Sequence, residues 1–217
     1  MTTMIDGPRV APASGVAARS LIILLHGYGS NGEDLIGLAL DWKSALPSTA
    51  FVAPDAPQPC PGAPDGYQWW PITSFDPASR VAGAASAAPA LDAFIDAELA
   101  RHGLTEAELA LVGFSQGTMM ALHVGPRRVR PLAGIVGYSG MLADEAGLAD
   151  PATTRPPILL IHGDADPMVP VAALHRAEVA LTRNGFAVET HVSPGLGHGI
   201  DLPGLALGRR FLTRVLG

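Results

Sequence analysis

The chain has 217 residues, with 14 basic and 20 acidic side chains and a formal net charge of −6. This length predicts one domain with a large core, over residues 1–217. The acidic balance argues against nucleic acid as a partner, because the basic cluster at Arg127, Arg128 and Arg130 is short. We expect that cluster to lie in a solvated loop.

The composition is apolar, with 16% charged residues and a mean hydropathy of +0.27. It predicts a well-buried sheet and an exposed apolar patch that would serve substrate binding or association into a homodimer. Cys60 is the only cysteine, which excludes a disulfide or a cysteine-based zinc site within the chain. The seven histidines have no metal-binding spacing such as H-E-x-x-H. We therefore expect neither a metal nor a cofactor.

The first 20 residues lack the apolar core of a signal peptide, and no apolar run reaches the length of a membrane span. These features predict a cytoplasmic protein. Residues 8–18 fit either a short antiparallel strand or a loop. The first strong strand is predicted at 21–25, where it runs into the turn His26-Gly27-Tyr28-Gly29, and a helix is predicted over 33–45.

A short strand at 50–53 precedes a long irregular stretch, residues 54–80, that is rich in proline and glycine. Its aromatic residues argue against disorder. They are Tyr67, Trp69, Trp70 and Phe75. The adjacent Trp69 and Trp70 fit two roles, because they could pack over an edge of the core or form the wall of a pocket at a strand end.

The rest of the chain alternates between helices and strands. The helix predicted over 81–102 contains Pro89, which either kinks it or marks its true start. Further strands are predicted at 109–112, 132–136, 157–161 and 187–192, and further helices after residue 115, at 171–183 and at 203–215. This alternation predicts an α/β fold with a mostly parallel sheet and helices on both faces.

The strand at 109–112 leads into Gly113-Phe114-Ser115-Gln116-Gly117, at the turn from a strand to a helix. This G-x-S-x-G pattern is typical of a nucleophile elbow, whose glycines leave room for a tight turn that presents the serine oxygen at the positive end of a helix. The pattern alone is weak, because a glycine turn capped by serine also fits it. A near match at Gly137 to Gly140 has Met141 in place of the second glycine.

A serine nucleophile needs a base and an acid that orients the base, and an elbow-type sheet places them, acid first, at the ends of later strands. After the strand at 157–161, both Asp164 and Asp166 are candidates for the acid. The spacing favours Asp166, because Asp164 could instead brace the turn. After the strand at 187–192, His198 lies among glycines and is the candidate base.

Other histidines fit structural roles better. His191 falls within a strand pattern, and His26 and His162 each end a strand, where we expect them to form local hydrogen bonds. Two backbone N–H groups would stabilise the oxyanion of a tetrahedral intermediate. One is that of Gln116, which follows the serine, and the other is that of Tyr28, unless its loop is an ordinary glycine turn.

Five segments resemble the serine carboxylesterases of the phospholipase/carboxylesterase family, which includes the acyl-protein thioesterases. They are HGYGSNGEDL at 26–35, APDAP at 53–57, GFSQGT at 113–118, HGDADPMVP at 162–170 and GLGH at 195–198. The resemblance spans nearly the whole chain. It implies an α/β-hydrolase fold without a large cap domain.

The same resemblance implies roles for individual residues. It implies a triad of Ser115, Asp166 and His198, with Tyr28 and Gln116 at the oxyanion hole. It places Trp69, rather than Trp70, at the border of the acyl site. Two further side chains, Met168 and Val169, together with Met119 and Met141, would line an apolar pocket, although methionine often fills gaps in cores.

We therefore expect a serine carboxylesterase that hydrolyses carboxylic esters through an acyl-enzyme on Ser115, with a small-molecule or lipid ester as substrate. Thioesters and lysophospholipids are further substrate classes under this hypothesis. Two alternatives remain open from the sequence: a peptidase or lactonase on the same fold, and a ligand-binding module with little turnover.

Overall fold

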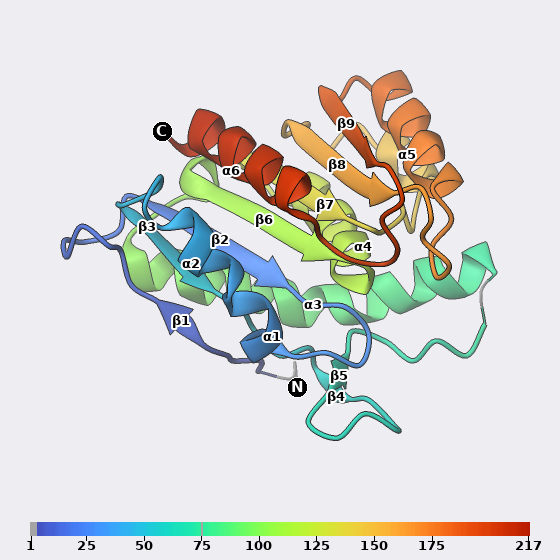
Figure 1. Cartoon of the computed structure of the whole chain (residues 1–217), viewed down its shortest axis with the longest axis horizontal. Helices are drawn as coiled ribbons and strands as arrows, with labels where there is room; N and C mark the ends of the chain where they lie inside the picture. The colour runs from blue at the N-terminus through green and yellow to red at the C-terminus, as the bar shows by residue number, and fades with distance from the viewer. Residues whose placement is uncertain (1–3, 75) are drawn as a thin grey trace.

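The computed structural model describes residues 4–74 and 76–217, so Phe75 of the aromatic loop lies outside the described residues. In the described residues, seven strands form one sheet with the order β1-β3-β2-β6-β7-β8-β9 (Figure 1). They are β1 (Arg9–Val10), β2 (Ser20–Leu25), β3 (Thr49–Val52), β6 (Leu109–Phe114), β7 (Gly134–Tyr138), β8 (Ile158–Gly163) and β9 (Val188–Ser193). Neighbouring strands are parallel, except that β1 is antiparallel to β3.

Helices cover both faces of this sheet. They are α1 (Gly32–Ile36), α2 (Leu38–Trp42), α3 (Pro77–His102), α4 (Gln116–Val124), α5 (Ala172–Arg183) and α6 (Leu202–Leu216), with short 3₁₀ turns η1 (Glu106–Glu108), η2 (Gly125–Arg127) and η3 (Ala146–Ala149). Helices α3, α4 and α5 pack on one face, and α1, α2 and α6 pack on the other (Figure 1). The predicted α/β fold with a mostly parallel sheet is confirmed.

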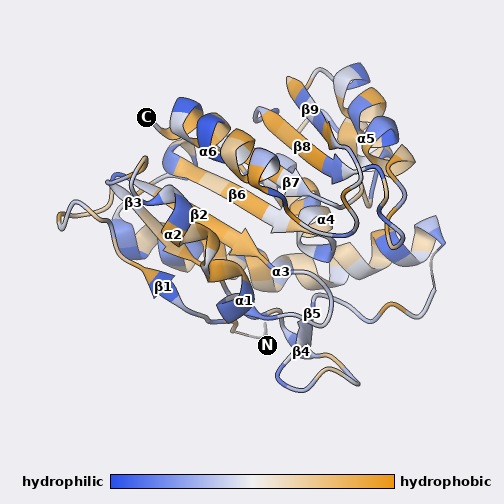
Figure 2. Cartoon of the chain, in the orientation of Figure 1, coloured by the Kyte–Doolittle hydropathy of each residue, from blue (hydrophilic) through white to orange (hydrophobic). Residues whose placement is uncertain are grey.

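The central strands are apolar on both faces because both faces are covered. In β2, Leu21 and Ile23 face the layer of α3, α4 and α5, whereas Ile22 and Leu24 face the opposite layer. All four side chains are fully buried. Figure 2 shows the same apolar character along β2, β6 and β8. Such uninterrupted apolar runs are what made these strands visible in the sequence.

Two predicted elements near the N-terminus change in extent. Of residues 8–18, only Arg9–Val10 form a strand, which pairs with the edge of β3. The single helix predicted over 33–45 is two short helices, α1 and α2, which meet at Gly37. Glycine is a poor helix residue because it loses the most backbone freedom on ordering, which accounts for the break.

Helix α3 begins earlier than residue 81, where it was predicted to start. Asp76 caps it by accepting the N–H of Ser79 at 2.9 Å, and Pro77 occupies its first turn. Pro89 lies inside the helix and is not its start. Strand β7 runs over Gly134–Tyr138 rather than over the predicted residues 132–136. The prediction stopped short because the strand contains two glycines, which are poor strand signals and here pack closely on Phe211 and Thr118.

The expectation of a solvated loop for the basic cluster is wrong for Arg128, whereas Arg127 and Arg130 are exposed. Arg128 is 9% exposed and donates to three carboxylates. These belong to Asp92, Asp96 and Glu106. Arg127 donates to the carbonyl of His123 at 2.7 Å and to Asp144 at 2.6 Å. The guanidinium of Arg128 therefore joins the turn after α4 to α3 and η1, whereas that of Arg127 forms its two contacts at the surface.

The segment between β3 and α3 adds a small ribbon beside the sheet, formed by β4 (Gln58–Pro59) and β5 (Tyr67–Gln68). Figure 1 shows it projecting below α1. An isolated bridge joins Ser30 to Tyr67, so the ribbon also contacts the loop after β2. Among residues 4–74 and 76–217, no helix has the length and apolar character needed to cross a membrane.

Candidate active site

Ser115 lies between β6 and α4, in a strained backbone conformation. Its φ is 54° and its ψ is −114°, and a positive φ at a non-glycine residue costs about 1–3 kcal/mol. The turn is held by the N–H of Ser115, which donates to the carbonyl of Tyr138 at 2.9 Å, and by the N–H of Met119, which donates to the carbonyl of Ser115 at 3.3 Å. Such strain persists where the surrounding structure fixes the backbone. The turn presents the serine side chain beyond the carboxyl ends of the strands.

The glycines on either side of the serine have no space for a side chain. A Cβ on Gly113 would overlap the backbone N of Thr118, and one on Gly117 would overlap the carbonyl of Leu25. Gly27 is also close, since a Cβ there would lie 3.3 Å from the Cβ of Ser115. Helix α4 therefore packs directly against β2, and the loop after β2 passes beside the serine.

The near match at Ser139 repeats part of this geometry but not its exposure. Ser139 also has a positive φ of 46° at the end of a strand. Its side chain is buried, however, and its Oγ donates to the carbonyl of Gly199 at 3.1 Å. Ser139 thus holds the loop next to His198 and has no access to a substrate.

Asp166 and His198 are in direct contact. His198 Nδ1 lies 2.8 Å from Asp166 Oδ2, and the other carboxylate oxygen accepts the N–H groups of Met168 at 2.8 Å and Val169 at 2.9 Å. The ring of His198 also packs against Phe114, with ring centroids 4.9 Å apart. The carboxylate side chain has no exposed surface, whereas that of His198 is 20% exposed. The imidazole is thus fixed by the acid on one side and open on the other.

The surroundings of Asp166 favour its charged form. Burial opposes ionisation, but two backbone N–H groups and the imidazole of His198 outweigh it and hold the pKa of this carboxyl below its usual value. A carboxylate at neutral pH accepts a hydrogen bond from the protonated Nδ1 of His198. The Nε2 atom of His198 then remains available as a proton acceptor.

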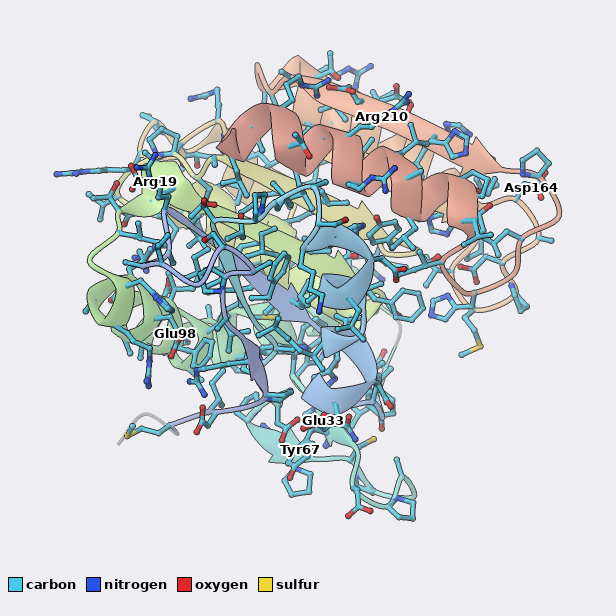
Figure 3. The ribbon with its side chains drawn as sticks, turned by 60° about the vertical axis from the view of Figure 1, so that its left-hand side comes forward. Arg19, Glu33, Tyr67, Glu98, Asp164 and Arg210 are labelled. Carbon is cyan, nitrogen blue, oxygen red and sulfur yellow. The ribbon has the colours of Figure 1, made fainter. Side chains whose placement is uncertain are left out.

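Two neighbours of this pair support it from behind. His162 is buried, and its Nε2 lies 2.7 Å from the carbonyl of Val169 and 3.3 Å from Asp166 Oδ2. Asp164 accepts the N–H of Gly195 at 2.6 Å, which ties the loop of the acid to the loop of the histidine. Figure 3 shows Asp164 at the outer edge of this end of the sheet. His162 thus forms the local hydrogen bond that the sequence suggested, whereas Asp164 bridges two loops and does not only brace its own turn.

The loop after β2 is held on several sides. His26 is buried, and its Nε2 accepts the N–H of Ala56 at 2.9 Å, so its Nδ1 carries the proton and donates to the carbonyl of Gly27 at 2.7 Å. Burial lowers the pKa of His26 and so maintains this neutral form. The N–H of Gly29 donates to the carbonyl of Tyr67 at 2.8 Å. Within the described residues, the N–H of Tyr28 has no acceptor.

The side chain of Gln116 joins the elbow to the segment after β5, a contact that the sequence did not reveal. Its Oε1 accepts the N–H of Trp69 and its Nε2 donates to the carbonyl of Trp70, both at 2.9 Å. As the first residue of α4, Gln116 also has a backbone N–H outside the ladder of the helix. The N–H groups of Gln116 and Tyr28 are therefore both available near Ser115.

A cavity of about 630 Å³ opens in front of Ser115. It is the size of a small-molecule site, and most of its wall is apolar. The described lining residues are Gly27, Tyr28, Ser30, Trp70, Ile72, Ser74, Arg80, Phe114, Ser115, Gln116, Met119, Met141, Met168, Val169, Pro170 and His198. Ser115, His198, Tyr28 and Gln116 thus meet at one cavity, with Met168 and Val169 in its wall.

Trp69 does not take the position that the resemblance implied. Its indole is fully buried beside His26, whose carbonyl accepts from Nε1 at 3.0 Å, and it does not line the cavity. Trp70 lines the cavity and packs so closely on Gly83 of α3 that a Cβ there would overlap its ring. Of the two tryptophans, only Trp70 therefore lines the cavity.

Arg80 is a further lining residue that the sequence did not indicate. It lies in the first turns of α3, whose start the sequence placed too late, and no motif marks it. Among the described residues, no group of three His, Cys, Asp or Glu side chains could hold a metal ion.

Comparisons with known proteins agree with this geometry. The family described as Phospholipase/Carboxylesterase matches residues 7–216. The chain is 30% identical to Esterase YpfH of Escherichia coli (strain K12) over 185 residues, which cover 85% of this chain and 78% of that protein. It is 33% identical over 179 residues to Acyl-protein thioesterase 1 of Schizosaccharomyces pombe, a match that covers 78% of each.

A solved structure gives the same result in three dimensions. The crystal structure of esterase PE8 superposes with a TM-score of 0.94 at 44% sequence identity, and the match covers 98% of this chain and 100% of that chain.

Proposed function

The chain belongs to the phospholipase/carboxylesterase family of hydrolases, and we propose that it hydrolyses carboxylic esters through an acyl-enzyme on Ser115. The observation that carries the proposal is the contact between Asp166 and His198 at 2.8 Å, at the same cavity as a serine held at φ 54°. A buried acid, an oriented imidazole and a strained serine are the parts that serine hydrolysis needs.

The reaction would proceed in two halves. Ser115 Oγ attacks the ester carbonyl carbon as its proton passes to His198 Nε2. The tetrahedral intermediate then collapses, the bond to the alcohol breaks, and the alcohol leaves with the proton from His198. Water repeats the sequence on the acyl-enzyme, which releases the carboxylic acid and restores the serine.

The oxyanion of each tetrahedral intermediate would accept the N–H groups of Gln116 and Tyr28. Each such donor is worth about 3–4 kcal/mol of barrier lowering when its position is fixed in advance. The support for this role is the bracing described above. Gln116 is anchored by its side chain, and the loop of Tyr28 is held by His26 and Tyr67.

Thioesters are a second substrate class that this site could cleave by the same steps. The observation that favours them is the similarity to proteins named Acyl-protein thioesterase 1. The wall of the cavity is apolar enough for an acyl chain. Matched oxygen esters and thioesters of one acyl chain would measure this preference as a ratio of kcat/KM.

The test of the proposal is steady-state hydrolysis of 4-nitrophenyl esters from acetate to palmitate, with Ser115→Ala as the variant. We expect the natural chain to hydrolyse these esters and Ser115→Ala to have lost this activity. The circular dichroism spectrum of Ser115→Ala should match that of the natural chain, which would show that the fold is retained. Ser44→Ala, an exposed serine after α2, is the matched control and should keep full activity. Retained turnover in Ser115→Ala would overturn the assignment.

The substrate panel should also include a peptide and a lactone, which test the alternative of a peptidase or lactonase. Binding of the same esters to Ser115→Ala should be measured as well, because tight binding with slow turnover by the natural chain would favour a ligand-binding module. The homodimer, the cytoplasmic location and the organisation as one domain stay predictions. Light scattering after size-exclusion chromatography measures the first of them.

A further inference from the structure

The carboxylate of Asp166 lies between two imidazole rings. Its Oδ2 is 2.8 Å from His198 Nδ1 and 3.3 Å from His162 Nε2. Its Oδ1 accepts the N–H groups of Met168 and Val169. The carboxylate side chain has no exposed surface, so solvent does not complete the set of donors. Within the described part of the chain, the two imidazoles are the side chains that contact Oδ2.

The proton on His162 is placed by a second contact of the same atom. Nε2 lies 2.7 Å from the carbonyl oxygen of Val169, and a carbonyl oxygen can only accept a hydrogen bond. Nε2 therefore carries a proton and donates it to this carbonyl, while the positive end of the same N–H group lies beside Asp166 Oδ2. One N–H group thus contacts both the acid and the backbone of the loop that carries the acid.

His162 gives that loop a fixed point of attachment. It belongs to β8, where it pairs with Val192 of β9, and it is 1% exposed. Asp166 instead lies on the loop that follows β8, and loops open more readily than buried strands. A side chain that is locked in the sheet can therefore hold the acid more precisely than the loop itself can.

We propose that His162 is a positioning residue for the reaction, because it fixes the direction of Asp166 Oδ2 and through it the orientation of His198. The inference rests on the proposed ester hydrolysis and adds a residue to it. Without the N–H of His162, the carboxylate is anchored through Oδ1 and can turn about that oxygen, away from His198. A misoriented imidazole accepts the serine proton more slowly.

The expected effect is on chemistry and not on substrate binding. His162 is not among the described residues that line the active-site cavity, so it does not contact a substrate there. His198 serves as base and acid in both halves of the reaction. Formation and hydrolysis of the acyl-enzyme should therefore slow together, which lowers kcat and leaves KM unchanged.

Three variants of His162 separate the N–H group from the bulk of the ring. His162→Leu keeps an apolar side chain and removes the donor. His162→Gln places an amide N–H close to the position of Nε2, whereas the shorter amide of His162→Asn reaches only to that of Nδ1. On 4-nitrophenyl butyrate, His162→Leu and His162→Asn should lower kcat about tenfold, the value of a hydrogen bond to a charged group. His162→Gln should restore most of kcat.

A second readout does not depend on turnover. The proton shared by His198 Nδ1 and Asp166 gives a ¹H NMR resonance far downfield of the backbone amides. We expect this resonance in the natural chain and in His162→Gln. In His162→Leu and His162→Asn it should shift or broaden, because the carboxylate is no longer held in one direction. An unchanged resonance in both of these variants would overturn the inference.

Leu159→Ala is the control for a general loss of stability. Leu159 is 3% exposed and lies in β8, but the alternation of side chains places it on the opposite face of the sheet from His162. The substitution leaves a cavity and should lower the urea midpoint while kcat is retained. Equal losses of kcat in Leu159→Ala and His162→Leu would contradict a role of the N–H group. So would equal losses in His162→Gln and His162→Leu.

The two proposals fail in different ways. If esters are hydrolysed by a Ser115-dependent reaction while kcat is insensitive to His162, only this inference is wrong. If the natural chain hydrolyses no ester, the proposed function is wrong, and the downfield resonance still measures whether His162 orients Asp166 and His198.

Discussion

The elbow and the two loops that bring acid and base to it are held by different forces. At the elbow, backbone meets backbone with no space between, since a Cβ on Gly113 or Gly117 would overlap main-chain atoms. At the loops, side-chain hydrogen bonds set the positions. Asp166 binds two N–H groups and His198, and Asp164 binds Gly195.

This difference separates the consequences of substitution. A steric constraint cannot be weakened in steps, because a backbone carbonyl cannot move aside without moving its strand. A hydrogen-bonded constraint can be weakened one bond at a time and depends on the ionisation of the carboxylate. We therefore expect abrupt effects from the elbow and graded, charge-dependent effects from the loops.

The largest effect is expected from Gly117→Ala. The added methyl group would overlap the carbonyl of Leu25 at the carboxyl end of β2, so either α4 or β2 must shift. Overpacking of this kind costs about 3 kcal/mol of unfolding free energy, and the elbow cannot keep its turn while it shifts. We expect ester hydrolysis to be lost and the urea midpoint to fall.

Gly197→Ala is the matched control beside His198. A Cβ on Gly197 has no heavy atom within 4 Å, and its φ is not positive. Its stability should change by about 0.5 kcal/mol or less. If Gly117→Ala and Gly197→Ala unfold at the same urea concentration, the elbow is not sterically fixed and the comparison between the two regions breaks down.

The next effect is expected from Asp166→Asn, paired with Asp164→Asn. The amide introduced by Asp166→Asn can still accept the two N–H groups, but it presents a donor to His198 and favours the tautomer that cannot accept the serine proton. We expect kcat to fall about 10⁴-fold, the loss that a neutral amide at this position causes in serine hydrolases. The free energy of unfolding of Asp166→Asn should change much less than that of Gly117→Ala.

Asp164→Asn keeps an oxygen that can accept the N–H of Gly195 and removes only the charge of an exposed group. Its kcat should change less than about tenfold, because one hydrogen bond to an exposed group contributes about 1 kcal/mol. Measuring both variants on 4-nitrophenyl butyrate assigns the acid. Equal losses of kcat in the two variants would contradict a special role for Asp166.

The sequence revealed the sheet and the constellation because both depend on local signals. The fully buried strand at Leu21 to Leu25 is a run without polar residues, and Ser115 and His198 each lie among glycines at a strand end. The order of these signals along the chain carried the prediction. The fold and the family are confirmed, whereas the roles of the site residues stay a proposal.

What the sequence missed depends on contacts between distant segments. The choice between Trp69 and Trp70 follows from the packing of Trp70 on Gly83 and from the amide of Gln116, which binds the backbone of both tryptophans. The burial of Arg128 follows from carboxylates on α3 and η1. Such partners are far away along the chain, and periodicity within one element carries no trace of them.

The smallest effect is expected on acid stability, from a residue of the elbow helix itself. His123 is 6% exposed, and burial first, then the charge of Arg127, lowers its pKa from 6.5 to about 4. As the pH falls below 6.5, the histidine is protonated in the unfolded chain but not in the folded chain. The free energy of unfolding therefore decreases between about pH 6.5 and pH 4. Between pH 6.5 and 5 this loss is about 2 kcal/mol.

In His123→Gln no proton is taken up, so the fall in unfolding free energy between pH 6.5 and 5 should shrink by about that amount. His175→Gln, at an exposed position of α5, is the control and should retain the slope of the natural chain. Urea unfolding at three pH values measures both. If only His123→Gln shows a weaker dependence of the unfolding free energy on pH, a pH-sensitive group lies in the elbow helix α4. Charge dependence is then not confined to the loops that carry Asp166 and His198. Parallel slopes in all three proteins would leave the acid sensitivity with Asp166 and its partners.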